Sequence, residues 1–167
     1  MNGDDAVALA RIVATEFQRR LLGEQLPRLR RCVELLGDER VWHRPTPNCN
    51  SVGNLLLHLR GNTTQWILAT FGVVTDQRQR PAEFAATAGA VGKVLVEALG
   101  ATYEQACRVV GQATVADLLR PRLVQDRYQE SGLSAVLHVL EHCSGHAGQI
   151  YAATKQATGL DLRFYDL

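Results

Sequence analysis

Residues 134–158 read SAVLHVLEHCSGHAGQIYAATKQAT, and this stretch decides the fold. Small or apolar residues recur in it every three to four positions, which is the spacing of one face of an α-helix. These residues are Ala135, Val139, Cys143, Ala147 and Ile150. We therefore predict a long helix that starts after Ser134 and runs to about Thr158, with Gly159 as its C-cap.

The same periodicity appears in three further segments, and no stretch shows the alternation typical of strands. We expect helices over residues 5–36, from a cap at Asn50 or Ser51 to about Gly72, and over residues 90–112. Pro27 must kink or interrupt the first of these helices, because proline has no backbone N–H to donate. The sequence thus predicts an all-α protein, a four-helix bundle in a single domain that spans residues 1–167.

The connecting segments carry weaker signals. Residues 77–84, QRQRPAEF, are interpreted as a polar connector. Residues 114–132 include Pro121 and are interpreted as a long loop with a short turn of helix at most. The tail LDLRFYDL, residues 160–167, is expected to pack back on the bundle through Phe164 and Tyr165.

Composition excludes several classes of protein. A chain of 167 residues, 46% of them hydrophobic, is long enough to bury a full core without disulfides or a structural metal. Its net charge of +1 and the lack of a Lys/Arg cluster argue against nucleic-acid binding. No apolar run reaches membrane-spanning length, and the start MNGDDAVALA is unlike a secretion signal. The four cysteines show no CxxC spacing and are interpreted as reduced thiols, so we expect a soluble cytoplasmic protein.

Three histidines are the candidate metal ligands. His142 and His146 lie four residues apart, so both imidazoles share one helix face with Cβ atoms about 5–6 Å apart. His58 lies on the flank of the apolar face of the second predicted helix. Together they would hold Zn, Ni, Cu or Fe and leave a coordination position open for water or substrate. A lone histidine such as His43 is more often an ordinary side chain, but packing alone gives no reason to bury several imidazoles on one strip.

Other polar residues near this strip receive lesser roles. His138 is interpreted as a wall of the pocket and Cys143 as core filler, while Cys49 is expected to be exposed in its loop. Glu141 points about 100° away from His142 on the helix, so no carboxylate is expected at the site as a general base. Residues 138–142, HVLEH, match the H-x-x-E-H motif of some metalloproteases, but the short tail that follows lacks the downstream ligand and scaffold of those enzymes.

Two longer runs carry a family resemblance. Residues 51–67, SVGNLLLHLRGNTTQWI, and residues 138–155, HVLEHCSGHAGQIYAATK, resemble the DinB/YfiT-like superfamily of metalloenzymes. WHRP at 42–45 and RFYDL at 163–167 fit one bacterial branch of it, so the resemblance spans nearly the whole chain. It implies a bundle in up-down-down-up order, a homodimer, and a divalent metal, often nickel or zinc, on His58, His142 and His146. Some relatives transfer or isomerise small molecules with the thiols mycothiol or bacillithiol.

Three functions remain open at this point. The first is a metal-dependent enzyme that uses a low-molecular-weight thiol as cofactor to transfer or isomerise a small-molecule substrate. The second is a hydrolase in which metal-bound water is the nucleophile. The third is a non-enzymatic module for metal binding or stress response. A metal on the same triad could activate either a thiol or a water molecule, but the lack of a protein base favours the thiol.

Overall fold

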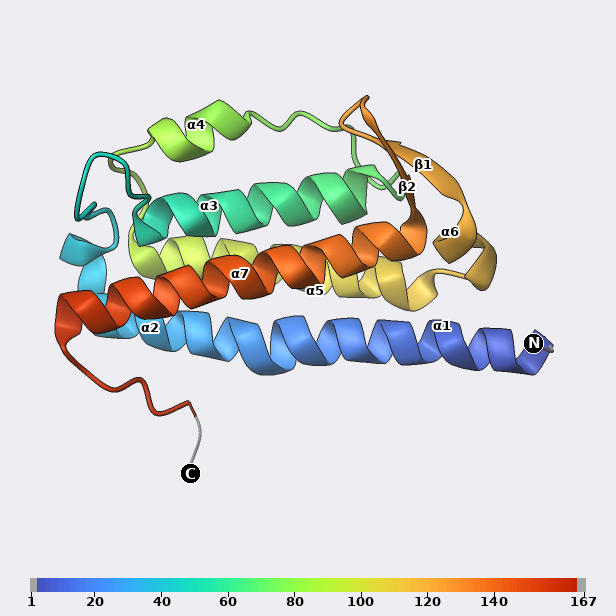
Figure 1. The fold of residues 1–167 in the computed structure, drawn as a ribbon, viewed down its shortest axis with the longest axis horizontal. Coiled ribbons are helices and arrows are strands. Elements are labelled where there is room, and N and C mark those ends of the chain that lie inside the picture. The colour runs from blue at the N-terminus through green and yellow to red at the C-terminus, as the bar shows by residue number, and fades with distance from the viewer. Residues whose placement is uncertain (1–2, 165–167) are drawn as a thin grey trace.

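Four long helical rods lie side by side in the computed structural model, which describes residues 3–164 (Figure 1). The first rod consists of α1 (Gly3–Gln18), the π-helical segment η1 (Arg19–Gln25) and α2 (Leu26–Arg40). The others are α3 (Val52–Thr63) with the π-helical segment η2 (Thr64–Ala69), α5 (Gly92–Gln112), and α7 (Gly132–Thr158). In Figure 1 the first rod and α7 run in one direction, and α3 and α5 run in the opposite direction. The predicted all-α helical bundle is confirmed.

The core is formed by the apolar faces of these rods. On α7 the buried residues include the five whose spacing predicted the helix: Ala135, Val139, Cys143, Ala147 and Ile150. The helices α2 and α3 both pack against α7, and both also pack against α5. Because most of the buried side chains of α7 are small, this helix approaches its neighbours closely. Polar side chains at the edge of its buried face thereby come within reach of α3.

Pro27 is accommodated by the π-helical turn that precedes it. The backbone N–H of Leu26 bonds to the carbonyl of Leu21, five residues back, and Pro27 stands in the first turn of α2. Proline is tolerated there, so the predicted interruption is a widened turn inside a continuous rod. The helical path breaks at Gly37, where φ is 66° and ψ is 171°, so the predicted end at Leu36 agrees with the structure, and a last turn beyond this kink extends to Arg40.

Ser51 caps α3, as predicted. Its hydroxyl accepts a hydrogen bond from the backbone N–H of Asn54 at 3.1 Å, and the Asn54 side chain accepts from the Ser51 N–H at 3.0 Å. This reciprocal capping box satisfies two N–H groups at the start of the helix. The helical path continues through η2 and ends in a turn at Gly72, where φ is +79°.

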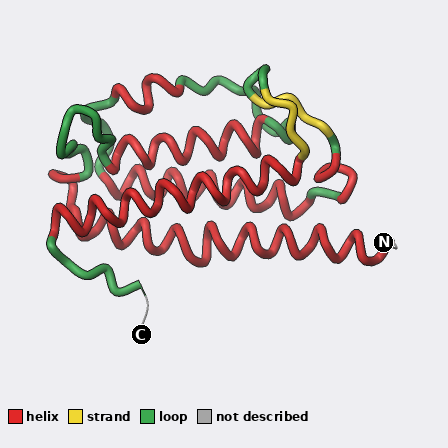
Figure 2. Tube along the Cα trace, in the orientation of Figure 1, coloured by secondary structure: helices red, strands yellow, loops and turns green. Residues whose placement is uncertain are grey.

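Two connecting segments differ from the prediction. The segment 77–84, predicted as a polar connector, leads into the short helix α4 (Arg80–Ala85), which lies over α3 (Figure 1). In residues 114–132 the predicted short turn of helix is present as α6 (Val115–Leu119), but the predicted loop after it forms a hairpin of β1 (Pro121–Val124) and β2 (Tyr128–Ser131), drawn yellow in Figure 2.

The hairpin gave little signal because each of its strands has only four residues, half of them exposed. Its turn places Gln125 and Asp126 at positive φ, 56° and 51°, as a tight hairpin turn requires. Asn-Gly or Asp-Gly is the usual pair at such a turn, and neither occurs here. The wrong prediction therefore follows from an atypical turn sequence between two very short strands.

The C-terminal end of α7 agrees with the prediction. The helix ends at Thr158, and Gly159 adopts the left-handed conformation with φ +69° while its N–H bonds to the carbonyl of Lys155. The tail then packs back, since the ring of Phe164 lies 4.8 Å from that of Tyr151. Tyr165, the other predicted packing residue, lies outside the described residues.

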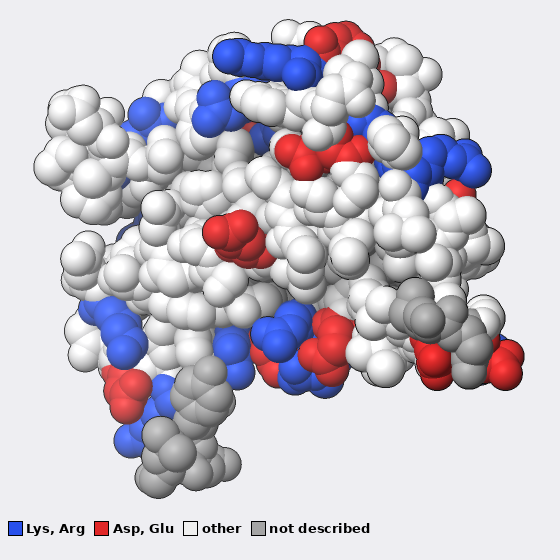
Figure 3. Space-filling model, turned by 45° about the vertical axis from the view of Figure 1, so that its right-hand side comes forward, with Lys and Arg blue, Asp and Glu red and all other residues white. Residues whose placement is uncertain are grey.

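Charged side chains of both signs are mixed on the face drawn in Figure 3, where patches of Lys and Arg lie beside patches of Asp and Glu. The net charge of +1 arises from 18 Lys and Arg against 17 Asp and Glu. Within residues 3–164, no helix combines the length and the apolar character needed to cross a membrane.

Candidate metal centre

His58 is held by the buried face of α3. Its side chain is only 3% exposed, and its sequence neighbour Leu59 belongs to the core. A buried imidazole loses its hydration, so its two ring nitrogens need partners. Both have one: Nδ1 lies 2.8 Å from Oε2 of Glu83, and Nε2 lies 3.1 Å from Nε2 of His142.

His142 and His146 lie one turn apart on α7 and meet His58 across the gap between α7 and α3. One ligand atom from each of the three residues lies within 4.8 Å of the other two. The ring of His146 is 4.9 Å from that of His58 and 4.5 Å from that of His142. Two nitrogens on one tetrahedral zinc at about 2.0–2.1 Å would be about 3.3 Å apart. The predicted ligands are therefore brought together at a spacing that fits a divalent ion.

Burial keeps the histidines on α7 uncharged. Desolvation, reinforced by the charges of His146 and His58, lowers the pKa of His142 to about 3. Desolvation also lowers the pKa of His146, and this outweighs the opposite effect of its hydrogen bond to Gln149. Both imidazoles are neutral at neutral pH, and a neutral imidazole has one nitrogen with a lone pair available to a cation.

Hydrogen bonds to Nδ1 orient two of the three rings. Oε1 of Gln149 accepts from Nδ1 of His146 at 2.9 Å, and Oε2 of Glu83 lies at the corresponding nitrogen of His58. Nε2 is therefore the nitrogen left for a cation on both rings. The Nδ1 of His142 is buried without a hydrogen-bond partner in the described part of the chain.

Glu83 is the residue of the site that the sequence did not reveal. It lies on α4, 25 residues from His58, in the segment predicted as a polar connector. Its carboxylate accepts hydrogen bonds from Nε and Nη2 of Arg78 at 2.8 and 2.9 Å. The sequence predicted no carboxylate that acts as a general base at the site, and it did not reveal this carboxylate beside His58. No helical spacing links Glu83 to His58, and only its place as a lone acid beside two arginines could have drawn attention to it.

The charge of Glu83 is maintained despite its burial. Desolvation alone would raise the pKa of this carboxyl, but hydrogen bonds from His58 and Arg78 outweigh it and hold the pKa below its ordinary value. Glu83 is thus ionised at neutral pH. Both of its oxygens are occupied by hydrogen bonds from these two side chains, so it is not a free base.

Comparison with known families gives this arrangement a context. The family model of mycothiol S-transferases matches residues 18–158, which run from the last residue of α1 to the last residue of α7. The chain belongs to the mycothiol S-transferase family. This family is part of the DinB-like superfamily, so the resemblance seen in the sequence is confirmed. A search of curated proteins returned no match.

In this member of the mycothiol S-transferase family, His138 lies beside the triad without joining it. Its ring stacks on Trp66 with the centroids 3.6 Å apart, and its Nε2 lies 3.1 Å from the side-chain nitrogen of Asn62. Burial lowers the pKa of His138. The half-buried ring therefore forms a wall next to the metal centre, in agreement with the interpretation from the sequence.

The remaining residues that the sequence singled out lie away from the triad. Cys143 is buried on the core side of α7, where its sulfur is 3.0 Å from the hydroxyl of Tyr103. Desolvation raises its pKa to about 11, as expected for core filler. Glu141, His43 and Cys49 are exposed.

Proposed function

We propose that this chain is a divalent-metal-dependent S-transferase that joins the sulfur of mycothiol to an electrophilic small molecule. The observation that carries the proposal is the convergence of His58, His142 and His146 within 4.8 Å, in a chain that belongs to the mycothiol S-transferase family. Zinc or nickel is the proposed ion, because imidazole nitrogens suit both metals.

A divalent cation bound there supplies a positive charge that lowers the pKa of a coordinated thiol, so that the thiolate is available at neutral pH. The residues of the chain set the conditions for this effect. Three imidazole ligands bring no negative charge of their own, so they leave the charge of a cation undiminished. His142 and His146 are half-buried, which keeps part of each ring accessible to a small molecule.

The thiol is proposed to come from a small molecule because the buried cysteines of the chain are kept protonated. Desolvation raises the pKa of Cys32, that of Cys107 to about 12 and that of Cys143 to about 11. The thiolate is the reactive form, so these side chains are poor nucleophiles at neutral pH. Cys49 is exposed, but it does not join the histidine cluster.

Hydrolysis by an activated water is supported less well. A hydrolase of this kind benefits from a protein base close to the nucleophile. Glu83 lies on the Nδ1 side of His58, away from the meeting point of the Nε2 atoms, and its oxygens are already hydrogen-bonded. Glu141 is exposed. This arrangement favours a nucleophile that needs no protein base.

The test is a conjugation assay with protein loaded with zinc or nickel. Mycothiol, bacillithiol and glutathione are each incubated with an activated haloarene, and the thioether product is measured. We expect product with mycothiol and wild-type protein, and only the background rate with His142→Ala. If the protein instead hydrolyses activated esters in a reaction that depends on His58 and consumes no thiol, the transferase proposal is refuted in favour of a hydrolase.

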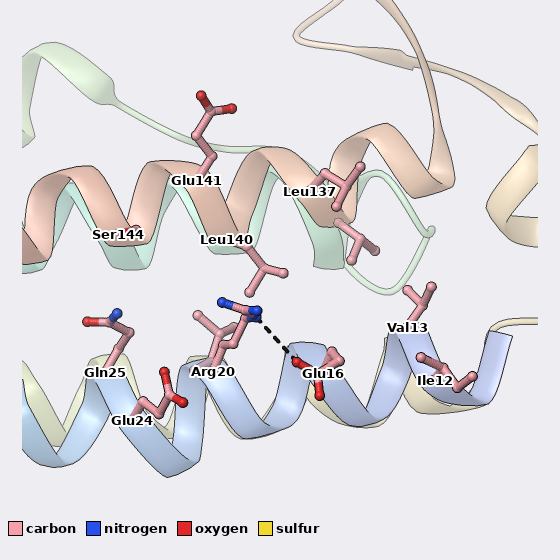
Figure 4. A pocket seen from close by; sticks show the side chains of 12 residues that line it. Ile12, Val13, Glu16, Arg20, Glu24, Gln25, Leu137, Leu140, Glu141 and Ser144 are labelled. Atoms are coloured by element: carbon pink, nitrogen blue, oxygen red, sulfur yellow. Dashed lines mark ion pairs between the residues drawn. The ribbon is translucent and has the colours of Figure 1, made fainter. Parts of the chain in front are cut away.

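We also propose a homodimer that forms through a groove between the first rod and α7. The groove has a volume of about 590 Å³, and Figure 4 shows Leu137 and Leu140 of α7 opposite Ile12 of α1. Its rim carries both signs of charge, with Arg20 at 3.4 Å from Glu16. In a two-fold dimer a patch meets its own copy, so a rim of mixed sign can pair with itself.

Sedimentation of matched variants tests the dimer. Leu137 is 55% exposed in the groove, and Leu119 is 66% exposed outside it. Leu137→Glu should give monomers, whereas Leu119→Glu should sediment as the wild type does. A wild-type protein that sediments as a monomer at assay concentrations would refute the dimer.

A further inference from the structure

A buried ion pair supports the metal centre from the side of α4. The side chains of Glu83 and Arg78 are only 11% and 6% exposed. Arg78 also donates to Oε1 of Gln65 at 2.9 Å, and the side-chain nitrogen of Gln65 is 2.6 Å from Oδ2 of Asp76. Desolvating an ion pair is costly unless its hydrogen bonds are satisfied, and here they are. Gln125 donates to Oε1 of Gln65 at 2.8 Å from outside the cluster, and the cluster reaches the histidine triad at the Nδ1 of His58.

The carboxylate determines which nitrogen of His58 carries the proton. An ionised carboxylate only accepts hydrogen bonds, so an Oε2 at 2.8 Å from Nδ1 requires a hydrogen between the two atoms. Arg78 Nη2 also lies 3.0 Å from this Nδ1, but it has Oε2 of Glu83 at 2.9 Å as an acceptor. If Nδ1 were instead unprotonated, its lone pair would face that of the carboxylate. The proton therefore lies on Nδ1, and Nε2 keeps its lone pair.

The sequence of α3 leaves room for this ion pair at Gly61. A Cβ atom built there would lie 2.1 Å from Oε1 of Glu83 and 2.9 Å from Nε of Arg78. Real Cβ atoms essentially never make contacts this short, so any larger residue must displace the two side chains. The carboxylate reaches His58 because position 61 has no side chain.

We propose that Glu83, held by Arg78 over Gly61, is a positioning residue that fixes the tautomer and the direction of His58 and thereby builds the cation site. This inference rests on the proposed metal-dependent function. A carboxylate that accepts from the far nitrogen of a metal-binding histidine both orients the ring and makes it a better ligand. Among the three histidines, His58 is the one whose ring is fixed by a buried charge; His146 has the amide oxygen of Gln149.

Glu83→Gln is the first test, with two measurements. The imidazole ¹⁵N shifts of metal-free protein report the tautomer of His58, and competition with a chromophoric chelator reports the zinc affinity. The amide keeps the shape of the carboxylate, but only its oxygen accepts hydrogen bonds, so it cannot accept at one position from Nε of Arg78 and at the other from Nδ1 of His58. We expect a shift of His58 away from the Nδ1–H tautomer and a loss of zinc affinity of about 10- to 100-fold. Glu97→Gln is the matched control, because Glu97 pairs with Arg30 far from the site.

Gly61→Ala is the second test, and it changes no charge. Alanine favours helix more than glycine does, so α3 itself should not be weakened. We expect the added methyl group to displace Glu83 and to reduce zinc affinity, while Gly111→Ala on α5, where a Cβ meets no atom within 4 Å, should not.

The outcomes separate this inference from the proposed function. If wild-type protein already carries the His58 proton on Nε2, or if Glu83→Gln alters neither the tautomer nor the zinc affinity, the positioning role is refuted. The tautomer is measured without metal. If wild-type protein binds no zinc, but Glu83→Gln shifts the tautomer of His58 as expected, the metal-dependent function is refuted and the role of Glu83 in fixing the tautomer is supported.

Discussion

His138 and His142 lie one turn apart on α7 and differ in what their nitrogens meet. Nε2 of His138 is hydrogen-bonded to Asn62 and its ring lies flat on Trp66, whereas Nε2 of His142 faces Nε2 of His58. Four residues at about 100° each place His142 about 40° around the helix from His138, and this offset separates the wall from the centre. The two side chains can therefore be tested separately by single substitutions.

Replacing His138 with alanine should weaken the fold and spare the metal site. The loss of the ring that stacks on Trp66 should cost about 1 kcal/mol of stability. Zinc affinity should be unchanged, because the substitution removes no member of the triad. Thermal unfolding and chelator competition measure the two effects, and a loss of zinc affinity as large as that of His142→Ala would make His138 a ligand.

The buried thiols should react with a thiol reagent more slowly than the exposed Cys49. Cys107 has its pKa raised to about 12 by desolvation, and a raised pKa keeps the thiol protonated as the pH rises through 9. A thiol reagent at pH 8 should therefore label Cys49 first, and Cys49→Ser should remove the rapid phase. Rapid labelling of Cys107 at this pH would show that the core around it opens.

At the scale of elements, the start of α3 and the end of α4 are tied together by Asn54. Its side-chain nitrogen donates to the carbonyls of Glu83 and Ala86 at 2.8 and 2.7 Å. Arg44 adds a bond to the carbonyl of Ala86 at 3.1 Å. The capping residue of one helix thus fixes the backbone that carries the carboxylate of the metal centre.

Asn54→Ala should therefore affect both stability and metal binding. It removes the donor to the carbonyl of Glu83 and one of the two donors to that of Ala86, at a cost of about 1–3 kcal/mol, and it frees the end of α4. Zinc affinity should fall with it. Thr114→Ala, which breaks the capping box of the peripheral helix α6, should cost about 1 kcal/mol without any change in zinc affinity. Equal zinc affinities in the two variants would show that the position of α4 does not affect the metal centre.

The elements that the sequence predicts are those with long apolar periodicity. The spacing of the five small or apolar residues predicted the extent of α7. The spacing of His142 and His146 within it predicted two members of the site. The helix α4 contributes no residue to the apolar core, so periodicity could not reveal it. Glu83 was missed for the same reason, since its link to His58 depends on how a connector folds back over α3.

At the scale of the whole molecule, the core continues through all four rods. Phe17, Ile67, Leu99 and Ile150, one from each rod, are fully buried, and a chain of this length can bury enough apolar surface to fold without a structural metal. The site lies at one edge of that core, between α3 and α7. Metal binding should therefore add to stability without being required for folding.

Removal of metal should leave the helices intact. Chelator-treated wild-type protein and His142→Ala should both keep the helical circular dichroism of untreated protein. Zinc at about 100 times its dissociation constant should stabilise the wild type by about 2.7 kcal/mol through binding to the folded state, and should not stabilise His142→Ala. Loss of helicity on chelation would make the metal structural instead.

The most direct measurement of the central claim is X-ray absorption at the zinc edge, combined with metal analysis, on wild-type protein and His142→Ala. We predict one zinc per chain with three imidazole nitrogens at about 2.0–2.1 Å in the wild type, and a sulfur at about 2.3 Å after mycothiol is added. His142→Ala should retain no tightly bound zinc. Zinc bound equally well in that variant, or a first shell without three imidazoles, would contradict the account.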